Sequence, residues 1–184
     1  MRKLSAWSLL FGSIVALFGT VLFASGNVPP IKPLEQDDLT KPAVIAAWLK
    51  TNSATAKRDE AALFFKNALK DKNRGAWGLA VKGFGISALR YPAPDTLVEY
   101  ADVSLRSARI ARERKQPDIQ SDRNSLAYIE SIYLSALAAD SVLNTLTPAA
   151  KQQARRNADC LGVFVTAGTI QPNCAPLQTY GLNK

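Results

Sequence analysis

The sequence predicts an all-α protein, with about six amphipathic helices packed as stacked helical hairpins behind an N-terminal signal or anchor segment. Apolar residues recur at three- and four-residue spacing along residues 39–161, which places them on one face of each helix. Prolines and glycines interrupt this spacing, as they do where short turns separate helices. Residues 163–166 could form either a short strand or a last helical turn, and no other alternating run is long enough for a sheet.

Residues 1–26 have the composition of a targeting segment. Arg2 and Lys3 precede the uncharged run 4–24, and small residues follow it, which is typical of a secretory signal. The alternative is an uncleaved anchor, because 21 uncharged residues are enough to span a bilayer. Both alternatives leave the basic end in the cytoplasm and place the rest outside. The expected location is the periplasm, or the periplasmic face of the inner membrane.

The charge balance is basic, with 23 Lys and Arg against 15 Asp and Glu, a net charge of +8. Such a chain is attracted to anionic surfaces, including phospholipid head groups, cell-wall polymers and acidic proteins. Export makes nucleic acid a poor expectation. The expected partner is another envelope protein or an anionic envelope surface, with the membrane itself contacted by the N-terminal segment if that segment is retained.

Turn signals divide the exported part into an extended, proline-rich leader (27–38), a helical domain (39–161) and an irregular tail (162–184). Thr40 is the expected cap of the first helix, with Pro42 in its first turn. Three glycines in the third helix are expected to permit close helix–helix approach. The later helices are expected at 54–72, 76–90, 95–115, from a Ser121 or Asp122 cap to Leu146, and from the Thr147-Pro148 start to Leu161.

Large aromatic residues on the predicted inner faces should be mostly buried. These residues are Trp48, Phe65, Trp77, Phe84, Tyr100 and Tyr133.

The two cysteines, Cys160 and Cys174, are expected to pair, because disulfides persist in an oxidising compartment. The bridge would fasten the tail to the sixth helix. Two free thiols or a redox couple are the alternatives, although catalytic pairs usually occur as Cys-X-X-Cys.

Small and large side chains alternate in a repeated order within residues 59–111. The order is seen in Ala61-X3-Phe65-X2-Ala68 and again in Ala101-X3-Leu105-X2-Ala108. This part of the chain resembles tetratricopeptide-type repeats, with Trp77 and Pro92 between the two copies. The separation of 40 positions, or 36 in another register, departs from the family's repeat of about 34. The resemblance implies a degenerate hairpin stack that binds peptides or partner proteins; the alternative is an irregular helical bundle.

The chain contains no histidine, which removes the commonest general base and the commonest zinc ligand. We predict no catalytic residue, no metal site and no cofactor. Asp102 and Arg106 have the four-residue spacing of a surface pair. Carboxylates could still cleave a glycan, and the candidates for that role are Glu99, Asp102, Glu113, Glu130 and Asp140.

A basic stripe is expected on the fourth helix, where Arg106, Arg109 and Arg112 step by three and Lys115 continues the series. It could be a solvated face that also offsets the helix dipole. The functional interpretation is a docking surface for an anion, with these residues opposite the packed face and free of partners inside the domain.

The function predicted from the sequence is an exported, non-enzymatic binding or assembly module of the bacterial cell envelope. One alternative is an envelope enzyme that acts on peptidoglycan or another glycan through carboxylates. A second is a small exported inhibitor or neutralising protein.

Overall fold

The computed structural model describes residues 32–114 and 118–182. The expected signal or anchor segment (1–26), the first part of the leader (27–31) and Lys115 lie outside these ranges. The described residues are all-helical and contain no strand, which confirms the predicted class. The elements are η1 (Gln36–Thr40), α1 (Pro42–Asn52), α2 (Arg58–Asn73), α3 (Trp77–Arg90), α4 (Pro94–Glu113), α5 (Ile119–Leu143), α6 (Pro148–Ala167) and α7 (Ala175–Tyr180).

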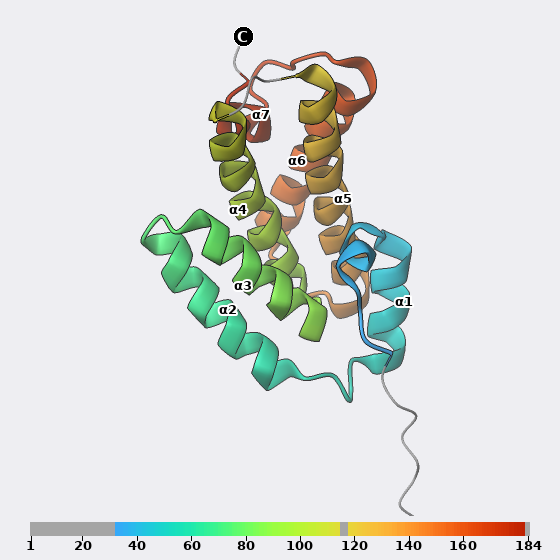
Figure 1. Ribbon diagram of the computed structural model, residues 1–184. Coiled ribbons are helices and arrows are strands. Elements are labelled where there is room, and N and C mark those ends of the chain that lie inside the picture. The colour runs from blue at the N-terminus through green and yellow to red at the C-terminus, as the bar shows by residue number, and fades with distance from the viewer. Residues whose placement is uncertain (1–31, 115–117, 183–184) are drawn as a thin grey trace, which may run out of the picture. The chain divides into compact units, whose positions relative to one another are not determined.

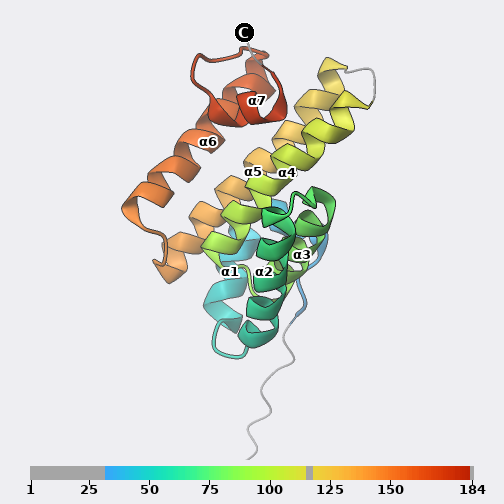
Figure 2. The same cartoon turned by 90° about the vertical axis from the view of Figure 1, so that its left-hand side faces the viewer.

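The helices α4 and α5 form an antiparallel pair around which the other helices pack (Figures 1 and 2). On one side α3 packs against α4, and α2 packs against α3. On the other side α1 and α6 both contact α5, and the short α7 contacts α4 and α6. Fully buried side chains fill the spaces between these helices, among them Phe84, Leu97, Ile132, Leu161 and Phe164.

Most of the aromatic residues expected in the core are buried there, but two lie at its edge. Phe65 belongs to α2, an outer helix that packs chiefly on α3, and its half-buried ring contacts the edge of Phe84 with centroids 5.4 Å apart. Trp77 begins α3 and is half-buried. Trp48, Phe84, Tyr100 and Tyr133 are buried, and Phe65 and Trp77 are partly buried against the core, so the expectation of mostly buried side chains is confirmed.

A glycine sets the distance between α2 and α3. A Cβ added at Gly83 would lie 2.8 Å from the Cβ of Ala68, which is closer than two such atoms can approach. The expected close approach is confirmed at this position. Gly78 has open space around it and plays no such part.

The first helix begins differently from the prediction. Thr40 is the last residue of η1, and Lys41 is the N-cap of α1. Glu35 and Asp38 form a reciprocal capping box that folds the end of the leader into η1, and Leu39 is buried as a result. The expectation of an extended leader up to residue 38 is therefore wrong at its C-terminal end.

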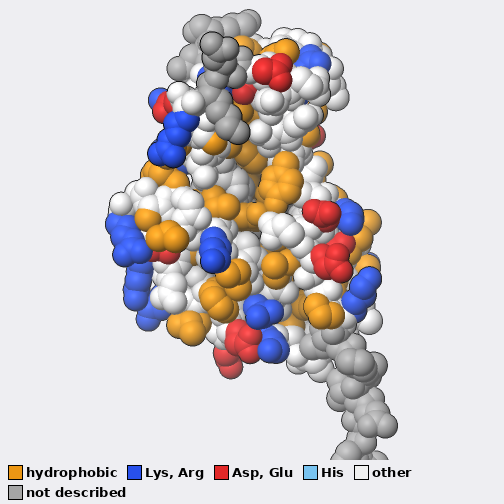
Figure 3. Space-filling view, viewed as in Figure 1, with side chains coloured by type: hydrophobic (Ala, Val, Ile, Leu, Met, Phe, Trp, Pro, Cys, Tyr) orange, Lys and Arg blue, Asp and Glu red, His pale blue; other side chains and the backbone are white. Residues whose placement is uncertain are grey.

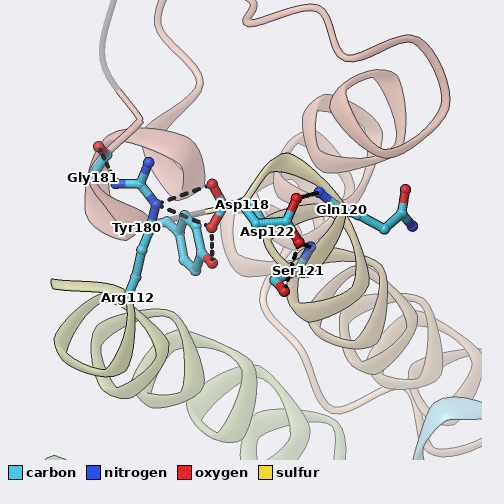
Figure 4. A network of polar contacts seen from close by, with 7 residues as sticks. All are labelled: Arg112, Asp118, Gln120, Ser121, Asp122, Tyr180 and Gly181. Carbon is cyan, nitrogen blue, oxygen red and sulfur yellow. Dashed lines mark hydrogen bonds and ion pairs between the residues drawn. The ribbon is translucent and has the colours of Figure 1, made fainter. Parts of the chain in front are cut away.

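Two later helix starts test the capping rules in opposite ways. Thr147 accepts a hydrogen bond from the backbone N–H of Ala150, 3.2 Å away, which confirms it as the cap of α6. The cap of α5 is Asp118, whose carboxylate accepts the N–H groups of Gln120 and Ser121 (Figure 4). The predicted cap, Ser121 or Asp122, is therefore wrong, because Asp118 lies just before the first turn and its carboxylate reaches the free N–H groups there.

The tail is more ordered than expected. The helix α6 continues past Leu161 to Ala167, so residues 163–166 are helical, and α7 follows. Cys160 and Cys174 form the expected disulfide, with Cα atoms 5.9 Å apart. Because Cys174 is the N-cap of α7, the bridge attaches α7 directly to α6.

Within the described ranges, α5 is the one helix long and apolar enough to cross a membrane by length and composition. Its apolar residues pack against α1, α4 and α6, as in the core helix of a folded domain.

Candidate functional site

A pocket of about 280 Å³ opens where α4, α5 and α6 meet the end of α2 and the start of α3. Polar and aromatic side chains reach it from five helices: Lys72, Trp77, Asp102, Arg106, Tyr133 and Asn157. One turn of α7 closes a further side. This convergence makes it the candidate site, because binding pockets place a few polar groups in a preformed concavity.

Asp102 and Tyr133 form the buried end of the pocket. The Tyr133 hydroxyl donates a hydrogen bond to one carboxylate oxygen of Asp102, and the tyrosine is fully buried. Burial raises the pKa of Asp102, although the hydrogen bond from Tyr133 opposes the rise. Burial likewise raises the pKa of Tyr133. A carboxyl group with a raised pKa in a cleft is a recognised mark of a functional site.

Lys72 brings positive charge to the same pocket from the end of α2. Its ammonium group lies 2.5 Å from the carboxylate of Glu99, and both side chains are partly exposed. Glu99 stands one helical turn before Asp102 on α4, and its negative charge adds to the rise in the pKa of Asp102. Lys72 therefore balances the charge of Glu99 and faces the pocket at the same time.

Arg106 lies over the ring of Trp77, with its guanidinium carbon 5.0 Å from the ring centroid. None of the ion pairs within the described ranges involves Arg106. The predicted Asp102–Arg106 pair is therefore wrong. Stacking on Trp77 holds the arginine, and the hydrogen bond from Tyr133 holds the aspartate, so the two charges remain unpaired with each other.

The other arginines of α4 lie outside the pocket. Arg109 is exposed and pairs with Glu113 at 2.7 Å. Arg112 donates from Nε to both oxygens of Asp122, at 3.0 and 3.1 Å, and from a terminal nitrogen to the carbonyl of Gly181 (Figure 4). The expectation that these arginines have no partner inside the domain is wrong. Arg109 pairs with a residue of its own helix, and Arg112 meets Asp122 of α5 and the residue that follows α7.

Figure 3 shows where the basic side chains lie on one face of the molecule. Lys and Arg side chains gather over the α2–α3 hairpin, and a smaller group lies over α4. The basic residues of the described chain therefore do not concentrate on α4 alone. Binding of an anion by the arginines of α4 stays a prediction, as does any role of Lys115.

The remaining candidate carboxylates lie elsewhere. Asp140 is buried at the end of α5, where it accepts the N–H of Leu146 at 2.8 Å and pairs with Lys151 of α6 at 2.7 Å. Burial alone would raise the pKa of Asp140, but these two contacts outweigh it and lower the pKa. Glu130 is half-buried, and burial together with Asp159 raises its pKa.

Of the predicted glycan-cleaving acids, Asp102 is therefore the one that lines the pocket. Within the described residues, no three Asp, Glu or Cys side chains lie close enough together to hold a metal ion.

Sequence reasoning missed the roles of Trp77, Tyr133 and Asn157 in this pocket. It assigned the two aromatic residues to the core on helical spacing, and that spacing carries no sign of a polar partner. Lys72 and Asn157 come from helices far apart in the chain, so no local pattern relates them. Comparisons with protein-family models, with curated proteins and with solved structures found no match for this chain.

Proposed function

We propose that this chain is an exported, non-enzymatic binding or assembly module of the bacterial cell envelope, and that the pocket lined by Asp102, Arg106 and Tyr133 is its binding site. One observation carries the proposal. The carboxyl group of Asp102 and the guanidinium group of Arg106, one turn apart on α4, both face the pocket and do not pair with each other. Groups of opposite charge left in this way suit a ligand that satisfies both.

Export is supported by two independent features. The basic and apolar character of residues 1–26 is that of a secretory signal or anchor. The Cys160–Cys174 disulfide belongs to an oxidising compartment such as the periplasm.

The arrangement of carboxylates favours binding over glycan cleavage. Glycosidases place two carboxyl groups on opposite sides of the scissile bond. Here Glu99 and Asp102 stand on the same helix, and Lys72 engages Glu99. The enzymatic alternative requires Asp102 to act as a general acid, which its raised pKa would suit. Release of reducing sugar from peptidoglycan, lost in Asp102→Asn, would establish that alternative.

We further propose that the helices form a stack of helical hairpins. Consecutive contacts from α2 through α6 support it, and the packing of α1 on α5 departs from a strictly sequential stack.

A blocked pocket tests the binding proposal. Ala175 is exposed on α7 and lines the pocket, so Ala175→Trp should fill the opening without entering the core. Ala111, exposed on α4 outside the pocket, supplies the control Ala111→Trp. Isotope-labelled protein would be titrated with peptide, protein and glycan fractions of a cell envelope.

We expect one fraction to shift the indole resonance of Trp77 in the wild type and in Ala111→Trp, but not in Ala175→Trp. Shifts that persist in Ala175→Trp would place binding elsewhere. If the active fraction contains an enzyme whose turnover this chain abolishes, the inhibitor alternative replaces the proposal.

A further inference from the structure

We infer that the pocket receives the C-terminal end of a peptide, with Arg106 holding the terminal carboxylate and Asp102 accepting a hydrogen bond from the last backbone N–H. This inference rests on the proposed function and names the ligand class of the same site.

The first step is the separation of the two charges. Four residues of α-helix place Asp102 and Arg106 about 6 Å apart along the axis, a spacing at which such side chains normally meet. In this protein an aromatic residue from another helix holds each of them: Tyr133 binds the carboxylate and Trp77 supports the guanidinium. The helix therefore presents a fixed acceptor and a fixed cation side by side.

The second step is the chemistry that fits both groups. A ligand must offer an anion to Arg106 and a hydrogen-bond donor to Asp102, with the two separated by a short link. The end of a peptide has this form, since one Cα atom joins its last N–H to its carboxylate. A guanidinium stacked on a ring keeps its N–H edge free for a bidentate bond to that carboxylate. Lys72 also lines the pocket, but its charge is balanced by Glu99, so Arg106 is the cation left for the carboxylate.

The third step is the route that the rest of a peptide would take. The pocket shares Gln153, Asn157, Ala175 and Pro176 with a neighbouring depression of about 410 Å³, which is lined by α6 and by residues 171–176. A chain whose end sits at Arg106 can therefore continue over Asn157 and Pro176. A free amino acid or a phosphate ion would need the first pocket alone, so the continuity favours a peptide.

The pocket volume agrees with this occupant. About 280 Å³ is close to the lower limit for small-molecule pockets, which suits one or two terminal residues and not a whole folded partner.

The test uses the purified full chain and three matched dipeptide probes, with affinity measured by calorimetry. The first probe is N-acetyl-alanyl-alanine with a free carboxylate. The second carries a C-terminal amide in its place, and the third has an ester oxygen in place of the last N–H. We expect the first probe to bind, and each altered probe to bind about 10- to 100-fold more weakly, as for the loss of one charge-assisted hydrogen bond.

The same measurements on variants of the protein test the two contacts from the other side. Arg106→Gln should abolish the preference for the free carboxylate, and Asp102→Asn should abolish the preference for the N–H over the ester. Arg109→Gln is the control, because Arg109 lies on the same helix outside the pocket. Its affinities should equal those of the wild type.

Equal binding of the free and amidated probes would overturn the inference. So would absence of binding, or inorganic phosphate binding as tightly as the first probe, which would indicate a simple anion site. The proposed function fails separately. If an envelope fraction shifts Trp77 in the wild type but not in Ala175→Trp while the dipeptides do not bind, the site stands and this ligand class is wrong.

Discussion

The hydroxyl of Tyr180 donates a 2.7 Å hydrogen bond to the carboxylate of Asp122, joining α7 to α5 across 58 residues. Asp122 is only 3% exposed, and Arg112 of α4 donates to the same carboxylate (Figure 4). Burial and this hydrogen bond raise the pKa of Tyr180 to about 12, so the phenol remains a donor at neutral pH. Together with the disulfide, the network holds α7 in place as one wall of the pocket.

Asp122→Asn should lower the free energy of unfolding by about 1–3 kcal/mol, since it removes the charged partner of two hydrogen-bonded groups while keeping an acceptor. Urea denaturation measures the change. The control is Glu113→Gln, which removes the exposed partner of Arg109 and should cost less than about 0.5 kcal/mol. Equal effects of the two substitutions would show that the buried network adds nothing to stability.

Replacing both cysteines, Cys160→Ala with Cys174→Ala, should cost about 3 kcal/mol for a loop of this length. The rate of amide hydrogen exchange should rise in α7 and stay unchanged in the buried middle of α5. The bridge attaches α7 to α6 and makes no link to α5. Faster exchange throughout α4 and α5 would mean that the disulfide supports the whole domain.

Two glycines of α3 should respond to alanine in opposite directions. Gly83→Ala sets a Cβ against Ala68 at 2.8 Å and should destabilise the fold by about 1–3 kcal/mol. Gly78→Ala meets open space and should be neutral or stabilise by up to about 1 kcal/mol through helix propensity. Thermal unfolding compares them, and similar melting temperatures would contradict the close packing of α2 on α3.

Asp102 should make the free energy of unfolding depend on pH. Burial raises its folded pKa above the ordinary value of 3.8, so the folded chain holds this proton more tightly than the unfolded chain. The stability that it contributes is present below the unfolded pKa and is lost as pH rises through the folded pKa. Relative to Asp102→Asn, the wild type should therefore lose stability as pH rises through this window.

Urea denaturation from about pH 3 to about pH 8 tests this slope. Asp118 provides a control of opposite sign, because hydrogen bonds from the backbone N–H groups of Gln120 and Ser121 lower its pKa. Relative to Asp118→Asn, the wild type should gain stability as pH rises. A flat difference for Asp102 would mean that its carboxyl group titrates normally.

The elements that follow from short-range rules could be predicted from the sequence. Apolar spacing predicted the helical class, Thr147-Pro148 predicted the start of α6, and glycine in α3 predicted a close helix contact. Each depends on residues within a few positions of one another or on a steric property of one residue. The disulfide followed from having two cysteines and an expected oxidising compartment.

Tertiary structure decided which polar groups meet. Helical spacing alone paired Asp102 with Arg106 and left Arg112 free, and both expectations were wrong. The deciding partners, Tyr133, Trp77 and Asp122, lie 10 to 31 residues away on other helices, where packing brings them into reach. Local patterns determine where helices begin and which face is apolar. Partners for buried charges depend on which helices pack together, because only that packing determines which donors remain nearby once water is excluded.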